Sequence, residues 1–423
     1  MVTNKQVPPL TQNKHTQHYK PLTVSSSNHV LDTLLGGGFT KGNTVLLAGP
    51  PGTGKTLFAF QWLFDGIEKK SENSIYLSLT EPLFKNLSNL EMMRFYKRDA
   101  IEKQQLTLLD LRREKKEIDP NHLLNALEHH VLQTGSKRVV IDSITAISQQ
   151  LENTFAIRNF IFRLGDLLAT LGCTTLLTSE AATKNLQTPF GVEEFIADTV
   201  IALEKVRIGQ EYQRCLTVVK NRGRNHKTQR AFYYITNKGL CLYPYSPPTL
   251  KHAESRIKVS SGIPGLDRLL SGGFFKGTST FLAGTTGTGK TLFALHFLIA
   301  GLKNNEACLY VSFEESKDAL RKNAENFGCN FPQHEQEKRL HLRCEPPEST
   351  FIEGHYQTIL SLIRRKRIQR CIIDSLSAVA NAFPEEHFLS FAKRLYLSLK
   401  QHGVTTLFTS AADTKEHMKE FTG

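Results

Sequence analysis

The sequence predicts an α/β fold: two tandem domains, each a mostly parallel sheet flanked by helices. Short apolar runs such as "TVLLAG", "SIYLSL", "VVIDS" and "TTLLTS" alternate with longer stretches of helical periodicity. Unbroken apolar runs are typical of strands that are buried on both faces. Strands that alternate with helices indicate a parallel sheet covered by helix layers. A long internal repeat indicates that this unit occurs twice.

The repeat covers most of the chain. The segment "LDTLLGGGFTKGNTVLLAGPPGTGKTLFAFQWLFDGI" matches "LDRLLSGGFFKGTSTFLAGTTGTGKTLFALHFLIAGL" in the second half. Three more pairs follow in the same order: "SIYLSLTEP" with "CLYVSFEES", "RVVIDSITAI" with "RCIIDSLSAV", and "CTTLLTSEAATK" with "VTTLFTSAADTK". Self-similarity of this kind indicates a duplicated structural unit.

The two copies differ after their last shared segment. The first continues with "FIADTVIALEKV", "RCLTVVKNRGRNH" and "RAFYYITNKGLCLY", whose β-branched and aromatic runs predict further strands. The second copy has no counterpart of these segments before Gly423. We therefore expect the second domain to lack its C-terminal strands, with a sheet edge left open.

The expected domain organisation follows from these boundaries. We expect a disordered tail at residues 1–20, a first domain at 21–243, a linker at 244–256 and a second domain at 257–423. The linker contains "PYSPPTLKHAES", which has three prolines and no periodicity. The polar N-terminus has no apolar core, so it does not read as a signal peptide.

Composition narrows the functional classes only a little. Lys and Arg total 53 against 40 Asp and Glu, and the net charge of +13 suits nucleotides, nucleic acid or an acidic partner. The seven cysteines are scattered, with no C-x-x-C pair, which favours free thiols in a reducing cytosol. No apolar run is long enough to span a membrane. We expect a cytoplasmic protein.

Each copy carries a phosphate-binding loop of the form G-x-x-x-x-G-K-[ST]. Glycines let backbone N–H groups converge on phosphate oxygens, the lysine reaches the β- and γ-phosphates, and the threonine offers a hydroxyl to Mg²⁺. The helical run after each loop adds a favourable N-terminal dipole. We predict ATP and Mg²⁺ as cofactors, bound by Gly49, Gly52, Thr53, Gly54, Lys55 and Thr56, and by Gly284, Gly287, Thr288, Gly289, Lys290 and Thr291.

A second metal ligand is expected at the end of a buried strand in each copy. Asp142 follows "RVVI" and Asp374 follows "RCII". An aspartate at the end of an apolar strand can also cap a helix. Because each accompanies a phosphate-binding loop, we favour the metal role, with Thr56 and Thr291 as partner ligands.

These segments resemble the KaiC family, within the RecA-like hexameric ATPases. The resemblance is carried by "LLGGGFTKG", the two "GTGKT" loops, "YVSFEES", "IDSLSAV" and "KNRGRNH" followed by "AFYYITNKGL". It covers roughly residues 25–423. It implies two RecA-like P-loop NTPase domains and a homo-hexamer of two stacked rings, with ATP bound between neighbouring subunits.

The resemblance also implies catalytic residues. An adjacent glutamate pair would orient and deprotonate the attacking water, and in the second copy it is Glu314 and Glu315. In the first copy Thr80 stands at the first position and only Glu81 remains. A threonine cannot act as a general base near neutral pH, which leaves Glu81 as the candidate base of the first copy. We expect slow hydrolysis in both domains, with the first serving mainly as a nucleotide-dependent assembly ring.

The resemblance further implies a Lys-x-Arg pair that reaches the nucleotide of a neighbouring subunit. Only the first copy has it, as Lys220 and Arg222 in "KNRGR". An arginine supplied in this way can raise phosphoryl-transfer rates by about 10³–10⁵. The alternative for such a run is a solvated basic loop.

The expected function is a KaiC-like Mg²⁺-dependent ATPase that forms a nucleotide-dependent hexameric ring, hydrolyses slowly and serves in regulation or signalling, with a possible regulatory protein partner. One alternative is a KaiC-like serine/threonine autokinase, although Ser410, Thr414 and Thr422 have no matching phosphoacceptor context. Another is a RecA-like DNA-dependent ATPase, suggested by the charge and by "IRRKRIQR". We do not favour nucleic-acid binding, because that run directly precedes a strand and is typical of charged residues at the end of a helix and in the following turn.

Overall fold

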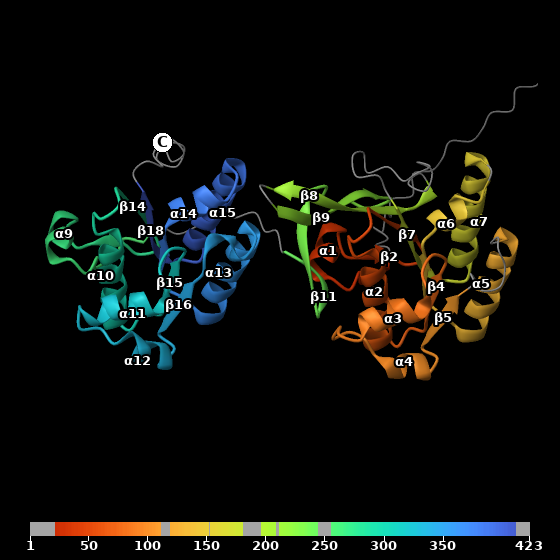
Figure 1. Ribbon diagram of the computed structural model, residues 1–423, viewed down its shortest axis with the longest axis horizontal. Helices are drawn as coiled ribbons and strands as arrows, with labels where there is room; N and C mark the ends of the chain where they lie inside the picture. The colour runs from red at the N-terminus through yellow and green to blue at the C-terminus, as the bar shows by residue number, and fades with distance from the viewer. Residues whose placement is uncertain are drawn as a thin grey trace, which may run out of the picture. The chain divides into compact units, whose positions relative to one another are not determined.

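A computed structural model describes residues 22–110, 119–151, 153–180, 196–208, 211–243 and 255–411. The chain divides into two compact units, the first mostly from residues before 205 and the second mostly from residues after 241 (Figure 1). The expected tail at 1–20, most of the expected linker and the candidate hydroxyls of Thr414 and Thr422 lie outside the described residues.

The first unit is built on a nine-stranded sheet with the order β11-β10-β9-β8-β3-β7-β6-β4-β5. From β8 to β5 the neighbouring strands run parallel. The segments that the sequence predicted as β-rich form β8 to β11, so that prediction is confirmed. The strands are β3 (Thr44–Ala48), β4 (Ser74–Ser78), β5 (Leu106–Asp110), β6 (Arg138–Asp142), β7 (Thr174–Ser179), β8 (Thr199–Ile208), β9 (Glu211–Asn221), β10 (Ala231–Thr236) and β11 (Gly239–Leu242).

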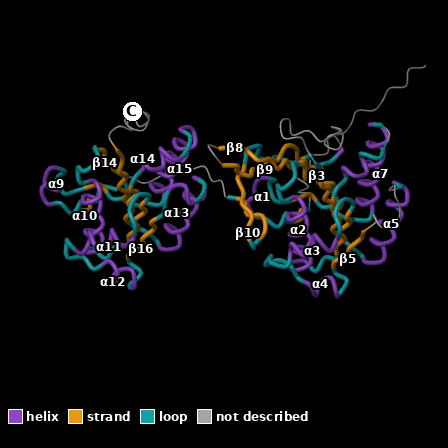
Figure 2. The backbone as a smooth tube through the Cα atoms, in the orientation of Figure 1, coloured by secondary structure: helices purple, strands orange, loops and turns teal. Residues whose placement is uncertain are grey.

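Helices cover both faces of the parallel part of this sheet (Figures 1 and 2). On one face, α5 and α7 pack on alternate strand residues such as Leu77 and Ile141. On the other, α2 follows the phosphate-binding loop. The described helices of this unit are α1 (His29–Leu34), α2 (Lys55–Lys70), α3 (Leu83–Leu90), α4 (Arg98–Glu102), α5 (Pro120–Thr134), α6 (Thr145–Ser148) and α7 (Thr154–Thr170).

The second unit repeats the parallel core. Its sheet has the order β14-β18-β17-β15-β16, all parallel, which corresponds strand for strand to β3-β7-β6-β4-β5. Residues 255–411 contain no counterpart of β8 to β11, so β14 has β18 as its one neighbour there. The strands are β14 (Ser279–Gly284), β15 (Cys308–Ser312), β16 (Leu340–Cys344), β17 (Arg370–Asp374) and β18 (Thr405–Ala411).

Two hydrophobic layers enclose this second sheet. One packs α13 and α15 against residues such as Val311 and Ile373, and the other packs α10 to α12 against Tyr310 and Ile372. In the part of the chain that the structure describes, no helix is both long and apolar enough to cross a membrane. The helices are α9 (Pro264–Leu269), α10 (Lys290–Lys303), α11 (Lys317–Glu325), α12 (Phe331–Gln336), η2 (Pro347–Ser349), α13 (Ile352–Lys366), α14 (Leu376–Ala382) and α15 (Glu385–Gln401).

A short antiparallel strand pair precedes each phosphate-binding loop: β1 (Thr23–Val24) with β2 (Phe39–Thr40), and β12 (Lys258–Val259) with β13 (Phe274–Phe275). An aspartate fixes the turn after the first strand in both. Asp32 accepts hydrogen bonds from the Ser26 N–H (2.7 Å) and the Ser25 hydroxyl (3.0 Å). Asp267 has the matching contacts in the second unit.

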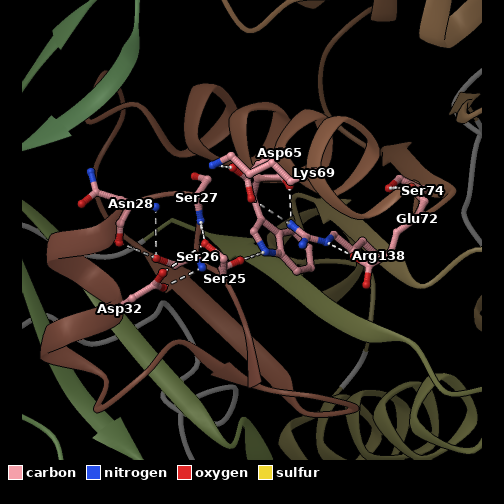
Figure 3. Close-up of polar contacts among 11 residues, drawn as sticks. Ser25, Ser26, Ser27, Asn28, Asp32, Asp65, Lys69, Glu72, Ser74 and Arg138 are labelled. Atoms are coloured by element: carbon pink, nitrogen blue, oxygen red, sulfur yellow. Dashed lines mark hydrogen bonds and ion pairs between the residues drawn. The ribbon is translucent and has the colours of Figure 1, made fainter. Parts of the chain in front are cut away.

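A buried arginine begins β6 in the first unit and β17 in the second. Arg138 is 1% exposed, and its Nε donates to the Glu72 carboxylate at 2.7 Å (Figure 3). Its Nη1 donates to the Trp62 carbonyl oxygen at 2.7 Å, and its guanidinium carbon lies 5.0 Å from the Trp62 ring centroid. The Trp62 indole in turn donates to the Ser25 carbonyl oxygen at 3.0 Å. The arginine therefore joins β6, α2 and the N-terminal turn.

The second unit repeats this arrangement around Arg370, which is fully buried. Its Nε donates to Glu306 at 2.7 Å, and its Nη1 donates to the carbonyl oxygens of Phe297 and Ser260. Arg370 ends the basic run "IRRKRIQR", so this guanidinium is not available to nucleic acid. The run itself is the last turn of α13 and the turn into β17, as the sequence predicted.

We predict that Arg138→Ala lowers the free energy of unfolding of the first unit by about 3 kcal/mol, because it leaves a carboxylate and a buried carbonyl without their partner. The measurement is guanidinium chloride unfolding followed by the fluorescence of Trp62, the chain's one tryptophan. Arg98→Ala is the control, since that side chain is 81% exposed and should cost under about 0.5 kcal/mol. Equal unfolding midpoints for the two variants would contradict the prediction.

Candidate nucleotide and metal site

Each phosphate-binding loop connects a strand of the parallel sheet to a helix, as the motif predicts. In the first unit it lies between β3 and α2, and in the second between β14 and α10. Gly54 and Gly289 immediately precede the helices with φ angles of 93° and 86°, a conformation that other residues rarely adopt. The lysine of each loop folds back on its own loop. The Lys55 ammonium donates to the Gly49 carbonyl oxygen at 2.7 Å, and Lys290 donates to that of Gly284 at 2.8 Å.

The first loop also needs glycine for close packing. A Cβ on Gly49 would lie 2.5 Å from the carbonyl oxygen of Leu203 in β8. The side chains of Thr53 and Thr288 brace the two loops in the same way, each donating at 2.8 Å to the carbonyl oxygen three residues earlier. The predicted loop residues therefore lie together in each unit.

The predicted metal ligands of the first unit are in direct contact. The Thr56 hydroxyl donates to Asp142 Oδ2 at 2.7 Å. The same oxygen accepts from the hydroxyl of Tyr76 in β4 at 2.7 Å, and Asp142 Oδ1 accepts from Thr178 in β7 at 2.5 Å. Burial and the neighbouring Asp142 carboxylate raise the pKa of Tyr76 well above its usual value. The tyrosine therefore stays protonated and acts as a hydrogen-bond donor.

The second unit has the same cluster. Thr291 donates to Asp374 Oδ2 at 3.2 Å, Tyr310 donates to that oxygen at 2.6 Å, and Thr409 donates to Oδ1. In each unit the tyrosine and the second threonine are contacts that sequence reasoning missed. A signal was present, because both copies place a tyrosine in "SIYLSL" and "CLYVSF" and a threonine in "LLTS" and "LFTS". These polar residues recur in strands that are otherwise apolar.

A cavity of about 390 Å³ lies beside the first loop. Residues of the loop line it together with Asp142, and Thr80 and Glu81 contribute from the end of β4. Asn86 and Glu180 also contribute to the lining. The cavity therefore joins the phosphate-binding loop, the candidate metal ligands and the remaining acid of the first copy.

The predicted acidic pair of the second unit lies at the end of β15. Glu314 Oε1 accepts a hydrogen bond from the Ser375 hydroxyl at 2.9 Å. Glu315 Oε2 lies 3.5 Å from the Asn323 side-chain nitrogen. Burial, then the charges of Asp374 and Glu314, raise the pKa of Glu315. A carboxylate with a raised pKa is a stronger base, which suits proton abstraction.

The first unit lacks this arrangement. Thr80 and Glu81 are exposed at the end of β4. The Ser78 hydroxyl donates to the Glu81 backbone carbonyl oxygen at 2.6 Å, whereas the matching Ser312 hydroxyl accepts from the Glu315 N–H at 2.8 Å. The backbone therefore turns differently after β4 than after β15. The two units differ here in backbone conformation as well as in having Thr80 at the position of Glu314.

The Lys220 and Arg222 segment lies apart from the first loop. The Lys220 ammonium donates to the Ala197 carbonyl oxygen at 2.7 Å, and Arg222 pairs with Asp198 at 3.5 Å. Burial, then the charge of Arg222, lower the pKa of Lys220. Among the described residues, neither side chain lines the cavity beside Lys55. The structure does not bring this pair to the nucleotide site of its own unit.

Comparison with known proteins decides the family. The family model described as "ATPase: KaiC" matches residues 24–246 and again residues 259–423. The chain belongs to the KaiC family. It therefore has the tandem RecA-like architecture of that family of ATPases, and the fold that the sequence predicted is confirmed.

Curated KaiC proteins match nearly the whole chain. The protein named circadian clock oscillator protein KaiC from a Nostoc species is 35% identical, over 90% of this chain and 75% of its own length. The protein of that name from Parathermosynechococcus lividus is 34% identical, over 89% and 71%. That from Synechococcus elongatus is 31% identical, over 95% and 79%.

The oxygen-rich cluster of each KaiC-type unit is chemically suited to Mg²⁺. This ion prefers hard oxygen ligands and is usually held by one or two protein groups together with substrate phosphates and waters. Thr56 with Asp142, and Thr291 with Asp374, supply a hydroxyl and a carboxylate next to a phosphate-binding loop. Among the described residues, no group of three or more His, Cys, Asp or Glu side chains offers a competing metal site.

We predict that Glu315→Gln stabilises the second unit at pH 7.5 and changes its stability less at pH 5. Because the folded protein raises the pKa of this carboxyl, the stability it contributes is present at low pH and is lost as the pH rises through the folded pKa. Glutamine removes that loss. Calorimetric melting of both proteins at the two pH values measures the difference.

Glu337→Gln in the same unit is a control of opposite sign. Hydrogen bonds from Arg339 and Gln333 lower the pKa of the Glu337 carboxyl, so its contribution to stability is present at neutral pH and lost as the pH falls. This variant should melt at a lower temperature than the wild type at pH 7.5. Shifts of the same sign for the two variants would contradict the assignment.

Proposed function

We propose that this protein is a Mg²⁺-dependent ATP hydrolase with a nucleotide site in each unit. The observation that carries the proposal is the repeated contact between a loop threonine and a strand-end aspartate, Thr56 with Asp142 and Thr291 with Asp374. Two independent copies of the same cluster, each beside a phosphate-binding loop, support nucleotide binding in both. Membership of a family of ATPases supports hydrolysis.

Different residues bind the phosphates and activate the water in the proposed hydrolysis. Backbone N–H groups of each loop and the ammonium of Lys55 or Lys290 bind the phosphates, and the ammonium exchanges its loop carbonyls for phosphate oxygens. Bound Mg²⁺ would neutralise charge on the β- and γ-phosphate oxygens. In the second unit the pair Glu314 and Glu315 takes a proton from the attacking water. The water oxygen bonds to the γ-phosphorus as the bond to ADP breaks.

The two sites are proposed to be unequal. The second unit has the acidic pair and a base of raised pKa, which supports faster turnover there. The first has the complete phosphate-binding loop but only Glu81 at the strand end. We infer that it hydrolyses more slowly and serves mainly in nucleotide-dependent assembly.

We also propose that the chain forms a homo-hexameric ring in which Lys220 and Arg222 reach the nucleotide of a neighbouring subunit. Among the described residues, neither side chain lines the cavity beside the loop of its own unit, which supports this proposal. The relatives are named circadian clock oscillator proteins, which supports a regulatory or signalling role rather than metabolic ATP turnover. Assembly would then be the output that nucleotide controls.

We predict that Lys290→Ala removes most ATP hydrolysis, whereas Lys55→Ala removes less of it and weakens assembly more. Loss of a charge-assisted contact to phosphate should cost at least about tenfold at the altered site. The measurements are steady-state phosphate release, ATP binding by calorimetry, and size-exclusion chromatography with light scattering in ATP and Mg²⁺. Unchanged binding and turnover in both variants would refute the proposed function.

We predict that Arg222→Ala, made in the Lys290→Ala background, lowers the remaining phosphate release of the assembled state by at least about tenfold, as expected for loss of an arginine supplied from a neighbour to the first unit's site. Arg230→Ala is a matched control. Its side chain is 58% exposed and pairs with Glu204 at 3.5 Å, while that of Arg222 is 60% exposed and pairs with Asp198 at 3.5 Å. A monomeric wild type in ATP and Mg²⁺, or equal loss in both variants, would contradict action across subunits.

A further inference from the structure

The Glu314 carboxylate is held by a hydroxyl from a neighbouring strand. Ser375 follows directly after β17, is 2% exposed, and donates to Glu314 Oε1 at 2.9 Å. Its oxygen also accepts from the Ala378 N–H at 3.2 Å, so that Ser375 caps α14. The carboxylate is therefore tied to the first turn of a helix as well as to the end of its own strand.

A second hydroxyl fixes the direction of the first. The Ser377 oxygen lies 2.8 Å from that of Ser375, and it accepts from the Ala411 N–H at 3.1 Å. A serine has one hydroxyl hydrogen, and that of Ser375 is used for Glu314. Ser377 must therefore donate to Ser375. The result is a directed chain of hydrogen bonds from the end of β18, through two serines, to Glu314.

The first unit has the serine but not its partner. Ser143 follows β6 as Ser375 follows β17, and it is 4% exposed. In the described part of the chain, its hydroxyl has no hydrogen-bond partner. Thr145, at the position of Ser377, instead lies 3.1 Å from the Ser179 hydroxyl. Thr80 at the position of Glu314 leaves Ser143 with no carboxylate to hold.

We propose that Ser375 is a positioning residue for ATP hydrolysis in the second unit: its hydroxyl fixes Glu314, with Ser377 behind it, so that the free carboxylate oxygen faces the attacking water. This inference rests on the proposed function. It extends it by naming the contact that orients the acidic pair and by explaining why Ser143 cannot do the same in the first unit. Fixing an acid in place is worthwhile because a displacement of about 1 Å can cost about 10²-fold in rate.

The first test compares Ser375→Ala with wild type by steady-state phosphate release. The rate of the second unit is defined as the part that Lys290→Ala abolishes. Ser375→Ala should lower kcat for this part at least about tenfold, while KM for ATP stays within about twofold, because the hydroxyl acts on the acid and not on the nucleotide. The matched change in the first unit, Ser143→Ala, should lower the phosphate release that remains in Lys290→Ala less than about twofold, because within the described residues its hydroxyl holds no carboxylate.

Two further variants separate positioning from the helix cap. Ser375→Gly also removes the hydroxyl but caps nearly as well as serine, so it should lose kcat as Ser375→Ala does while melting close to wild type. Ser375→Thr keeps a hydroxyl and should restore most of kcat. A kcat that follows melting temperature across these variants would overturn the inference.

A double-mutant cycle tests whether the serine acts through Glu314. In a Glu314→Ala background, Ser375→Ala should cause no further loss of kcat, since the carboxylate it holds is gone. Additive losses would overturn the inference and leave the ATPase proposal intact. A wild type that binds ATP but releases no phosphate would overturn both.

Discussion

The two units are organised around a buried carboxylate at the end of β6 in the first and of β17 in the second. Asp142 and Asp374 each accept hydroxyl hydrogens from the helix after the phosphate-binding loop and from both neighbouring strands. A buried carboxylate without hydrogen-bond donors would be strongly destabilising. The donors must therefore stay in place, and this holds three neighbouring strands and one helix in a fixed position relative to one another. The position of the phosphate-binding loop beside the acidic strand end follows from this arrangement.

The two units share this carboxylate cluster but differ in the candidate catalytic residues around it. The second has an acid held by Ser375, whereas in the first the Ser143 hydroxyl has no hydrogen-bond partner among the described residues, and Thr80 stands at the position of Glu314. The first has the Lys220 and Arg222 segment at the end of β9, and residues 255–411 contain no counterpart of that strand. A duplicated fold can diverge in this way because the carboxylate cluster consists of other residues than the acidic pair and the Lys220 and Arg222 segment.

The sequence predicted the parallel cores well, because strands covered on both faces must be apolar and because each apolar strand pattern occurs in both copies of the repeat. It did not indicate β5 and β16, which are edge strands with fewer apolar constraints. The loop residues, Asp142 and Asp374 could be placed from the motif alone. Tyr76 and Thr178 recur as polar residues in otherwise apolar strands of both copies, but the sequence does not show their shared partner, which becomes adjacent only when the parallel strands align. The bond from Ser375 to Glu314 likewise depends on a strand pairing that sequence does not show.

The buried arginines at the opposite end of the same strands have a consequence for how the units open. A guanidinium stays charged at any accessible pH. Separating α2 from β6 would therefore leave the charged Arg138 without the Glu72 carboxylate, the Trp62 carbonyl oxygen and the Trp62 ring. Partial opening at this end is therefore unfavourable. Amide hydrogens of α2 and β6 should exchange with deuterium together, as one cooperative block, while the strand ends that carry the acids exchange by smaller local fluctuations.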